Sequence, residues 1–350
     1  MLRPVTLLSL ATKTPPHHLT QDAALGTARE MLAGKLDNFE RFRSVFANAG
    51  IAARQLAQPV SWYLEPRDFT ERTDAYLTVA LDLFVEAAEV ALARAGLDAA
   101  DVDTIVTVSS TGIATPSLEA RALGRMDFRP DVARVPVFGL GCGGGVTGLG
   151  LSARLARADP GSVVLLVTVE LCSLAWRTDG VDKADVIAAA LFGDGAAACV
   201  VTVGDEGFAH ISGSAEHSWP GTLDVMGWAM EPTGLGVVLN RGIPAFVCQN
   251  MTQAMERMLD SQGIRCCDVD RFICHPGGAK VIDAMELALS LDQGSLDHER
   301  EVLRSHGNMS APTALFVLDR VRAGEMPPLS VLTALGPGFT ATTVTLRSAA

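Results

Sequence analysis

The stretch "VARVPVFGLGCGGGVTGLG" (residues 132–150) combines an apolar run, a single cysteine among glycines and the start of an apolar, helix-like segment. The apolar run predicts a buried strand at 133–139, and the spacing after it predicts a helix from about 143 to 158. Because glycine lacks a Cβ, it permits the sharp turn and close backbone approach that such a junction needs around Cys142. The stretch therefore favours an α/β fold with this junction near its centre.

The same alternation of helix and strand continues on both sides of the junction. Apolar positions at helical spacing over 74–96 precede a strand at 102–110, and "SVVLLVTVE" predicts another strand at 162–170. Near-continuous apolar strands are typical of a sheet that is covered on both faces. The second half of the chain repeats this theme, which indicates a duplicated topology. Further elements are expected at 116–125, 191–203, 244–262, 271–275, after 276 and in the β-rich tail 329–348.

Composition limits the classes of function. The 350-residue chain is 48% hydrophobic and 19% charged, which is typical of a globular protein with one large core or two fused cores. With a formal net charge of −12, the chain lacks the positive surface potential that binding to nucleic acids or anionic membranes requires. Neither is therefore an expected partner. No run reaches the roughly 18 apolar residues of a membrane-spanning helix, so no membrane insertion is expected.

Seven cysteines are scattered along the chain without a CxxC pair. An odd number without a spacing pattern is typical of the reducing cytoplasm and predicts neither a disulfide framework nor a zinc site. We therefore expect a cytoplasmic protein without a bound metal.

Cys142 is the first candidate for chemistry, because it lies between a buried strand and an apolar helix. At a helix N-terminus, free backbone N–H groups and the helix dipole favour the thiolate, and the turn projects the sulfur into a cavity. This placement predicts a nucleophile. The alternative is a buried structural cysteine packed among small residues.

A thiol nucleophile needs a base, and "ICHPGGAKVIDAM" (273–285) places His275 between an expected strand and an expected helix. The helix N-terminus disfavours the imidazolium and so favours a neutral ring that accepts a proton. The alternative is a capping or core histidine. His306 is the competing candidate for the base, although it lies in a cap-like loop.

The segment "SHGNMSAPTALFVLDR" (305–320) places Asn308 and Ser310 before a strongly amphipathic helix. A neutral amide that does not titrate is suited to donate a hydrogen bond to a developing oxyanion. Ser310 is a second candidate for this role. Both residue types are also favoured N-caps, which is the structural alternative.

Together these segments resemble those of the type III polyketide synthases, which use a Cys-His-Asn triad on the thiolase fold. The resemblance covers nearly the whole chain and includes "TGIATPS" (111–117), "ELCSL" (170–174), "LFGDGAAA" (191–198) and "GPGF" (336–339). It implies a homodimer of an α/β protein with duplicated, layered α/β/α/β/α halves. The half at 1–205 would carry the cysteine, and the half at 206–350 would carry the histidine and asparagine.

The resemblance also implies the reaction. A starter acyl-CoA would acylate Cys142, and His275 with Asn308 would hydrogen-bond the thioester carbonyl of malonyl-CoA while carbon dioxide leaves. Claisen attack of the enolate on the Cys142 thioester would lengthen the chain by two carbons. The family chemistry uses CoA thioesters as substrates and implies no metal, flavin or nicotinamide cofactor.

The family pattern implies further site residues. Phe192 occupies the gatekeeper position between the CoA tunnel and the cavity, and Cys172 falls on the cavity wall. Thr111 and Thr115 would also line the site, with Thr115 reaching across the dimer. Val237 stands where plant enzymes carry a bulky aromatic residue, which predicts a wider cavity. Cys172 and Val237 together would then open a tunnel for a long alkyl starter.

The basic residues that hold the CoA phosphates in this family match best to Arg41 and Arg43, although a solvated helix face is an equal alternative. Two further positions that are usually basic in the family are Ser44 and Asn48. Asp194, in "LFGDG", is assigned to a turn.

The leading hypothesis is a type III polyketide synthase of a bacterial kind. The amino-acid sequence at 170–174 and 227–234 is similar to that of synthases that make alkylpyrones and alkylresorcinols from long-chain starters. A single-round ketoacyl synthase of the fatty-acid type, acting on carrier-protein substrates, is the first alternative and would stop after one extension. A cysteine thioester hydrolase that uses Cys142 and His275 is the alternative from another class, and it would not need malonyl-CoA.

Overall fold

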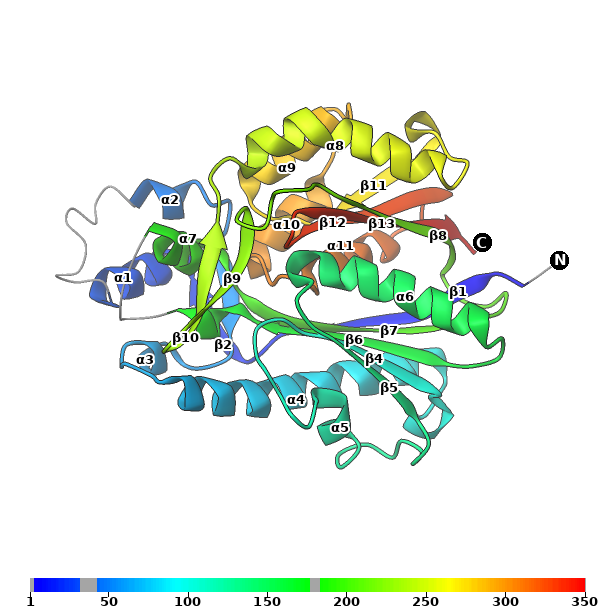
Figure 1. The fold of residues 1–350 in the computed structure, drawn as a ribbon, viewed down its shortest axis with the longest axis horizontal. Coiled ribbons are helices and arrows are strands. Elements are labelled where there is room, and N and C mark those ends of the chain that lie inside the picture. Colours follow the sequence, from blue (N-terminus) through cyan, green and yellow to red (C-terminus); the bar gives the residue numbers. More distant parts are fainter. Residues whose placement is uncertain (1–2, 32–42, 177–182, 350) are drawn as a thin grey trace.

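The computed structural model describes residues 3–31, 43–176 and 183–349, which form a mixed nine-stranded sheet. The strand order across this sheet is β11-β12-β13-β8-β1-β7-β6-β4-β5 (Figure 1). Its strands are β1 (Val5–Lys13), β4 (Thr104–Val108), β5 (Ala133–Val137), β6 (Val164–Leu171), β7 (Asp194–Val203), β8 (Ala209–Ser218), β11 (Arg271–Cys274), β12 (Leu329–Gly336) and β13 (Thr340–Ser348). Two small sheets accompany it, formed by β2 (His17–Thr20) with β3 (Ala53–Leu56) and by β9 (Met226–Glu231) with β10 (Gly234–Leu239).

Helices form three layers around the strands (Figure 1). The outer face of β1, β7, β6, β4 and β5 is covered by α4 (Phe69–Ala95) and α5 (Leu118–Ala122), and that of β8 and β11–β13 by α8 (Ile243–Asp260) and α9 (Ala279–Ala288). Between the two groups of strands lie α6 (Gly144–Ala158) and α11 (Thr313–Arg322). The other helices are α1 (Gln21–Met31), α2 (Arg43–Ala47), α3 (Val60–Tyr63), α7 (Lys183–Leu191) and α10 (Asp297–His306). The layers follow the order α/β/α/β/α, and this prediction is confirmed.

The two groups of strands share one pairing pattern. In the first group, β4 runs parallel to β6, β6 antiparallel to β7, and β7 antiparallel to β1. In the second group, β11 runs parallel to β12, β12 antiparallel to β13, and β13 antiparallel to β8. The duplicated topology is therefore confirmed, with β5 as an addition to the first group. The expected division at 205/206 falls between β7 and β8, and the two groups meet where residues 5–7 pair with residues 209–211.

The glycines after Cys142 allow α6 to approach its neighbours closely. A Cβ on Gly145 would lie 2.2 Å from the carbonyl oxygen of Ala311, and one on Gly144 would lie 2.6 Å from the side chain of Val108. Neither distance leaves room for a side chain, so glycine lets α6 pack against both β4 and the segment before α11. The glycine-rich stretch thus places the cysteine at the middle of the molecule.

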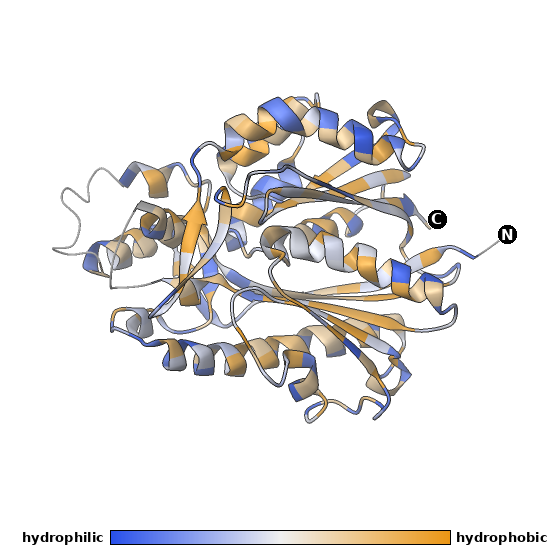
Figure 2. Ribbon diagram, in the orientation of Figure 1, coloured by the Kyte–Doolittle hydropathy of each residue, from blue (hydrophilic) through white to orange (hydrophobic). Residues whose placement is uncertain are grey.

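Apolar side chains fill the space between the layers. Separate buried clusters lie between α4 and the first group of strands, around α6 and α11, and between α8, α9 and the second group. Figure 2 shows the matching hydrophobic residues along β4, β6 and β7. Every residue of β6 is buried, as its nearly continuous apolar sequence predicts for a strand covered on both faces.

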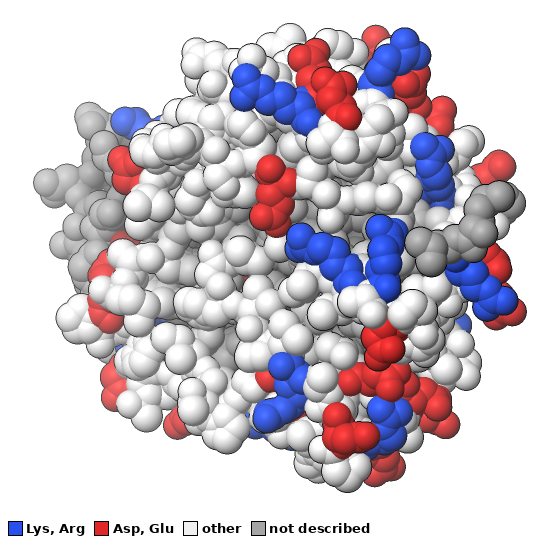
Figure 3. Space-filling view, turned by 45° about the vertical axis from the view of Figure 1, so that its right-hand side comes forward, with Lys and Arg blue, Asp and Glu red and all other residues white. Residues whose placement is uncertain are grey.

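The helices within the described ranges are all too short or too polar to cross a membrane. On the face of Figure 3, acidic and basic side chains are interspersed and leave a broad uncharged area between them. That face is therefore mixed in charge instead of uniformly basic.

Candidate active site

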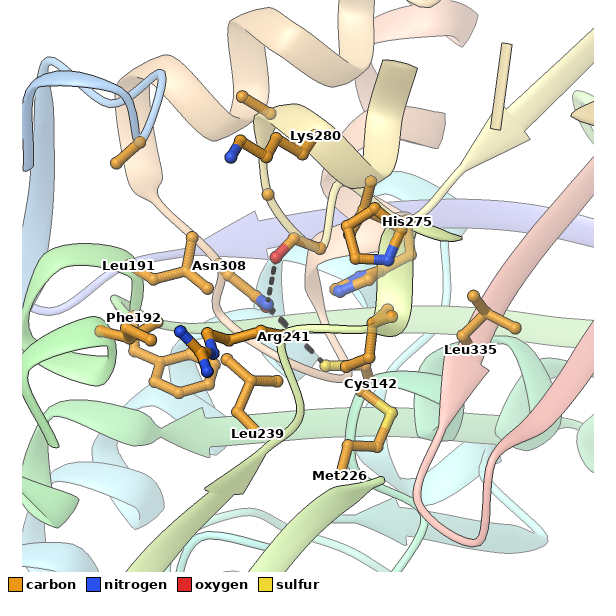
Figure 4. A pocket seen from close by; sticks show the side chains of 18 of the residues that line it. Cys142, Leu191, Phe192, Met226, Leu239, Arg241, His275, Lys280, Asn308 and Leu335 are labelled. Atoms are coloured by element: carbon orange, nitrogen blue, oxygen red, sulfur yellow. Dashed lines mark hydrogen bonds between the residues drawn. The ribbon is translucent and has the colours of Figure 1, made fainter. Parts of the chain in front are cut away.

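Three predicted residues, Cys142, His275 and Asn308, line one cavity of about 410 Å³ (Figure 4). Their exposed fractions are 8%, 7% and 3% respectively, so all three are buried residues of the cavity wall. They come from a 3-10 turn at 141–143, from the end of β11 and from the segment before α11. The fold thus brings together residues as distant as Cys142 and Asn308, which are 166 positions apart.

Asn308 is fixed by its backbone to the segment that carries Phe192. The Asn308 N–H donates to the carbonyl of Leu191 at 2.9 Å, and the Gly193 N–H donates to the carbonyl of Asn308 at 3.0 Å. Together these bonds make a short parallel bridge between Phe192 and Asn308. A residue of the C-terminal half is thereby held against a residue of the N-terminal half.

The side-chain amide of Asn308 has a defined orientation. Its Oδ1 accepts a hydrogen bond from the N–H of Ser310 at 2.8 Å and lies 3.9 Å from the sulfur of Cys142. Nδ2 lies 3.4 Å from the carbonyl oxygen of Gly277 and 4.0 Å from the sulfur of Cys142 (Figure 4). The N-cap alternative does not apply, because the N-cap of α11 is Pro312. The amide is thus placed as a donor beside the thiol.

His275 follows β11 and donates its backbone N–H to the carbonyl of Thr333 in β12 at 2.8 Å. Neither of its ring nitrogens has a hydrogen-bond partner among the described residues. Burial lowers the pKa of His275 to about 4, so the ring is neutral near pH 7. A buried, unpartnered imidazole beside a cavity can bind a substrate atom or accept a proton.

The competing base, His306, lies in different surroundings. Its Nδ1 lies 2.8 Å from Oε1 of Gln55, and its ring packs edge-on against Phe316 with centroids 5.2 Å apart. It does not belong to the lining of the 410 Å³ cavity. The structure therefore favours His275 over His306 as the base.

Burial raises the pKa of the Cys142 thiol to about 11, and hydrogen bonds involving Ser310 and Asn308 partly oppose this rise. The sequence predicted instead that a helix N-terminus would favour the thiolate. The two differ because the sulfur is buried and lies in the 3-10 turn at 141–143, before the first turn of α6. Forming the nucleophile therefore requires a base that takes the thiol proton, which is the role predicted for His275.

Glu170 is a buried carboxyl close to the nucleophile, and no motif had singled it out. It lies in β6, and its Oε2 accepts hydrogen bonds from the N–H of Ser110 at 2.9 Å and the hydroxyl of Thr111 at 2.8 Å. Burial raises the pKa of Glu170 to about 8, while Ser310 acts to lower the pKa of both Glu170 and Cys142. The available sequence signal was a carboxyl within an apolar strand. Thr111, predicted to line the site, is instead a buried partner of this carboxyl.

Phe192 both lines the cavity and belongs to a separate apolar cluster with Cys172 and Ala188, against which Trp228 and Val237 pack. The ring centroids of Phe192 and Trp228 are 6.0 Å apart, and Cys172 is fully buried. Cys172 and Val237 therefore do not line the cavity, contrary to expectation. Packed side chains thus lie where the tunnel was predicted, and the largest of them is the half-buried Trp228 of β9.

The other residues expected near the substrates are dispersed. Thr115 is exposed in the loop between β4 and α5, and it does not belong to the lining of the cavity. Arg41 lies outside the described residues. Arg43 is exposed at the start of α2, while the neutral residues Ser44 and Asn48 line the cavity.

Two basic residues that no motif had indicated, Arg241 and Lys280, line the cavity as well (Figure 4). Arg241 follows β10, and Lys280 lies in the first turn of α9, five residues after His275. Both side chains are exposed to solvent, so they lie at the mouth of the cavity. For Lys280, the available sequence signal was its place directly after the "HPGGA" turn.

The sequence predicted a turn at Asp194, and this is wrong. Asp194 begins β7, is fully buried, and accepts hydrogen bonds from the N–H groups of Ala57 at 2.6 Å and Ser173 at 2.8 Å. Burial raises its pKa to about 7. Arg54, also fully buried, donates to the carbonyl of Phe192 at 3.2 Å. These charged side chains thus hold the chain on both sides of Phe192.

A buried thiol, a neutral imidazole and an amide donor that line one cavity are suited to acyl transfer. The thiol carries the acyl group as a thioester, and neutral donors stabilise an oxyanion or enolate as its charge develops. Within the described ranges, no group of three or more His, Cys, Asp or Glu side chains is placed to hold a metal ion.

Comparison with known proteins points to one family. Residues 60–205 match the N-terminal domain of the chalcone and stilbene synthases, and residues 210–350 match the C-terminal domain. A 1,3,6,8-tetrahydroxynaphthalene synthase of Streptomyces peucetius subsp. caesius is 39% identical over 99% of this chain and 93% of that protein. A putative chalcone synthase of Bacillus subtilis (strain 168) is 33% identical over 95% of this chain and 96% of that protein. The crystal structure of 1,3,6,8-tetrahydroxynaphthalene synthase from Streptomyces coelicolor A3(2), a bacterial type III polyketide synthase, covers 98% of this chain and 99% of its own, with TM-score 0.92 and 27% identity.

Proposed function

Because the chain belongs to the chalcone and stilbene synthase family of type III polyketide synthases, we propose that it condenses malonyl units onto an acyl-CoA starter carried on Cys142. One observation carries this proposal: the thiol of Cys142, the unpartnered ring of His275 and the amide of Asn308 open on the same cavity. Neutral donors suit a reaction in which negative charge develops transiently on a thioester oxygen.

The proposed reaction starts with acylation. His275 takes the thiol proton, the Cys142 thiolate attacks the starter thioester, and CoA leaves with that proton. Malonyl-CoA then loses its carboxylate as carbon dioxide, and the electron pair of the broken C–C bond forms an enolate. Its oxygen accepts hydrogen bonds from His275 and Asn308. The enolate carbon attacks the acyl thioester, Cys142 leaves as thiolate, and return of the extended chain from CoA to Cys142 permits another round.

CoA enters, in this proposal, at the mouth of the cavity, where Arg241 and Lys280 meet its phosphates. Arginine and lysine are the usual partners of phosphate groups, and both side chains are exposed at the cavity lining. Replacing both by alanine should raise KM for CoA thioesters about tenfold or more and leave kcat unchanged, because the phosphates are distant from the reacting carbon. A fall in kcat at unchanged KM contradicts this role.

For the starter, we propose a short acyl or malonyl group, and for the product a compact hydroxylated aromatic. The packing of Cys172, Trp228 and Val237 against Phe192 supports this, because it fills the space where a long alkyl chain was expected. The relative from Streptomyces peucetius is named for tetrahydroxynaphthalene, a bicyclic aromatic compound without an alkyl chain.

A long-chain starter with an alkylpyrone or alkylresorcinol product is the second candidate. The sequence of residues 170–174 and 227–234 favours it, because these segments resemble those of synthases that use long-chain starters. So do apolar side chains of the cavity lining, among them Leu191, Leu239 and Leu335, since each CH₂ removed from water contributes about 0.8 kcal/mol. In this case the alkyl group of the starter lies along that lining or displaces Trp228.

We also propose a cytoplasmic homodimer in which Thr115 reaches across the interface. Two exposed apolar side chains support this: Ile113, 47% exposed, lies two residues before Thr115, and Phe138, 57% exposed, directly follows the edge strand β5. All seven cysteines are free, which suits a reducing compartment. Sedimentation should give twice the chain mass of 36.8 kDa, and a fully active monomer contradicts the dimer.

The decisive experiment incubates the purified protein with malonyl-CoA and a series of acyl-CoA starters of about two to sixteen carbons, a range that spans several kcal/mol of burial. Mass spectrometry of the products should show several extensions, with short starters preferred. A single extension identifies the ketoacyl synthase alternative. Thioester cleavage that does not need malonyl-CoA identifies the hydrolase alternative.

A further inference from the structure

We infer that Glu299 is a positioning residue, which holds the end of β11 and thereby sets the place of His275 relative to Asn308. The inference rests on the proposed function and adds to it a residue that does not touch the substrate. Its basis is the contact between the buried Glu299 side chain of α10 and the main chain directly before His275.

The end of β11 is held by a side chain where the equivalent strand of the first group is held by a neighbouring strand. β11 is an edge strand of the nine-stranded sheet, whereas its counterpart β4 is covered by β5. The Ser109 N–H, directly after β4, donates to the carbonyl of Val137 in β5 at 3.2 Å. The Cys274 N–H, at the end of β11, donates instead to Oε1 of Glu299 at 2.9 Å. The next N–H, that of His275, pairs with β12, so the main chain before the histidine is fixed from both sides.

Arg271 holds the Glu299 carboxylate in this position. Its guanidinium donates to Oε2 of Glu299 at 2.7 Å and lies 3.5 Å from Oδ1 of Asp297. Arg271 lies in β11, three residues before Cys274, so the carboxylate joins the helix to two points of the strand. Glu299 is fully buried, and a buried carboxylate is unfavourable unless it is paired and hydrogen-bonded, as both of its oxygens are here.

The helix that carries Glu299 also leads to the second donor. Glu299 lies in the first turn of α10, and the chain leaves the last residue of this helix through Gly307 directly to Asn308. Because His275 and Asn308 line the same cavity, a shift of β11 against α10 changes the distance between them. Two donors act on one oxygen only if both lie within hydrogen-bond distance of it. A misplacement of about 1 Å can therefore slow the reaction by up to about 10²-fold.

The experiment measures decarboxylation of malonyl-CoA to acetyl-CoA in a Cys142→Gln background, in which acyl transfer is absent. Glu299→Ala should lower kcat about tenfold or more, because the buried Cys274 N–H loses its acceptor and the strand end shifts. KM should stay unchanged, since Glu299 does not belong to the cavity lining. Glu299→Asp should also lower kcat, because its shorter side chain keeps the charge beside Arg271 but does not reach both donors.

Glu286→Ala is the matched control. Glu286 is also a buried carboxylate, which pairs with Arg300 at 2.6 Å and accepts the N–H of Leu296 at 3.0 Å. Its main-chain partners lie in the segment before α10 and not in β11. Denaturant titration should show that both alanine variants lose stability, whereas only Glu299→Ala loses kcat.

Unchanged kcat in folded Glu299→Ala and Glu299→Asp overturns the inference. An equal fall of kcat in Glu286→Ala, or a rise in KM that accounts for the whole loss, overturns it as well. Should Glu299→Ala fail to fold, Glu299→Asp compared with Glu286→Asp decides the question by the same kcat. Failure of the proposed function gives a different result, because the Cys142→Gln protein with Glu299 intact would then form no acetyl-CoA from malonyl-CoA.

Discussion

His275 and Asp194 are both buried titratable side chains, but their polar atoms meet opposite surroundings. The ring nitrogens of His275 have no partner among the described residues, and His275 lines the cavity. The carboxyl group of Asp194 accepts hydrogen bonds from Ala57 and Ser173 and lies near Arg54. Burial shifts the pKa of both, to about 4 and about 7 respectively. A shifted pKa alone therefore does not identify an active site; free polar atoms beside a cavity do.

This fold therefore contains two kinds of buried polar residue: those that face the cavity and those whose polar atoms are hydrogen-bonded within the protein. Changes on the cavity side, at Cys142 or Asn308, should remove chemistry and leave stability nearly intact. Changes within the buried frame, at Asp194 or Glu170, should alter stability more than chemistry. Variants on each side test whether this separation holds.

The largest effect is expected for Cys142→Ala, which should abolish polyketide formation because no acyl-enzyme can form. Intact-protein mass spectrometry after incubation with acyl-CoA should show no added acyl mass, while the free energy of unfolding stays within about 1 kcal/mol of native. Cys172→Ala is the matched control, since Cys172 is also buried but does not line the cavity. Acylation that persists in Cys142→Ala and vanishes in Cys172→Ala contradicts the assignment of the nucleophile.

Asn308→Ala should slow the decarboxylation of malonyl-CoA by about 10²–10³-fold, the usual cost of losing one oxyanion donor. Formation of acetyl-CoA measures this step. A Cys142→Gln background isolates decarboxylation from acyl transfer, because glutamine cannot carry the acyl group. If decarboxylation is unchanged in Asn308→Ala but lost in Ser310→Ala, the donor role belongs to Ser310.

Asp194→Ala should lower the free energy of unfolding by about 3–5 kcal/mol, because it leaves the buried guanidinium of Arg54 without its nearby carboxyl group. Denaturant titration measures the loss. Asp82→Ala is the control, since Asp82 pairs with Arg125 at 3.1 Å on the surface, where loss of a pair costs less than about 1 kcal/mol. Equal losses in the two variants would show that Asp194 is no more important than a surface charge.

Glu170→Gln should change the pH dependence of stability. The pKa of Glu170 is raised from its ordinary 4.5 to about 8 in the folded state, so this group favours folding below pH 4.5 and loses that contribution as the pH rises through 8. Glutamine does not ionise. The variant should therefore gain stability relative to the native protein between about pH 5 and 8, by at most about 1.4 kcal/mol per pH unit. A stability difference between the two proteins that stays constant from about pH 5 to 8 would mean that the pKa of Glu170 is not raised by folding.

The element order and the segments that carry Cys142, His275 and Asn308 could be predicted because their signals are local. The apolar run at 162–170 corresponds to β6, and the helix expected from 143 to 158 corresponds to α6. Cys142, His275 and Asn308 all lie at the ends of such elements, beside glycines or cap-like residues, so the segment that carries each of them was visible in the chain.

The surroundings of Cys172 and Asp194 could not be predicted, because they depend on distant segments. Cys172 lies in a buried cluster with Ala188 and Phe192, against which Trp228, far along the chain, packs. Asp194 lies between two glycines, a composition typical of turns. The N–H of Ala57, 137 positions away, makes it a buried acceptor instead.

A chimera that joins the N-terminal half of this chain to the C-terminal half of a relative would keep the bridge between Phe192 and Asn308, because its hydrogen bonds join only main-chain atoms. Crossover between β7 and β8 would leave Cys142 with its own half and bring in a new β9–β10 hairpin together with its counterpart of Trp228. On the proposed function, the choice of starter would then change together with the C-terminal half. A single recombination event could change the product without a new triad having to evolve.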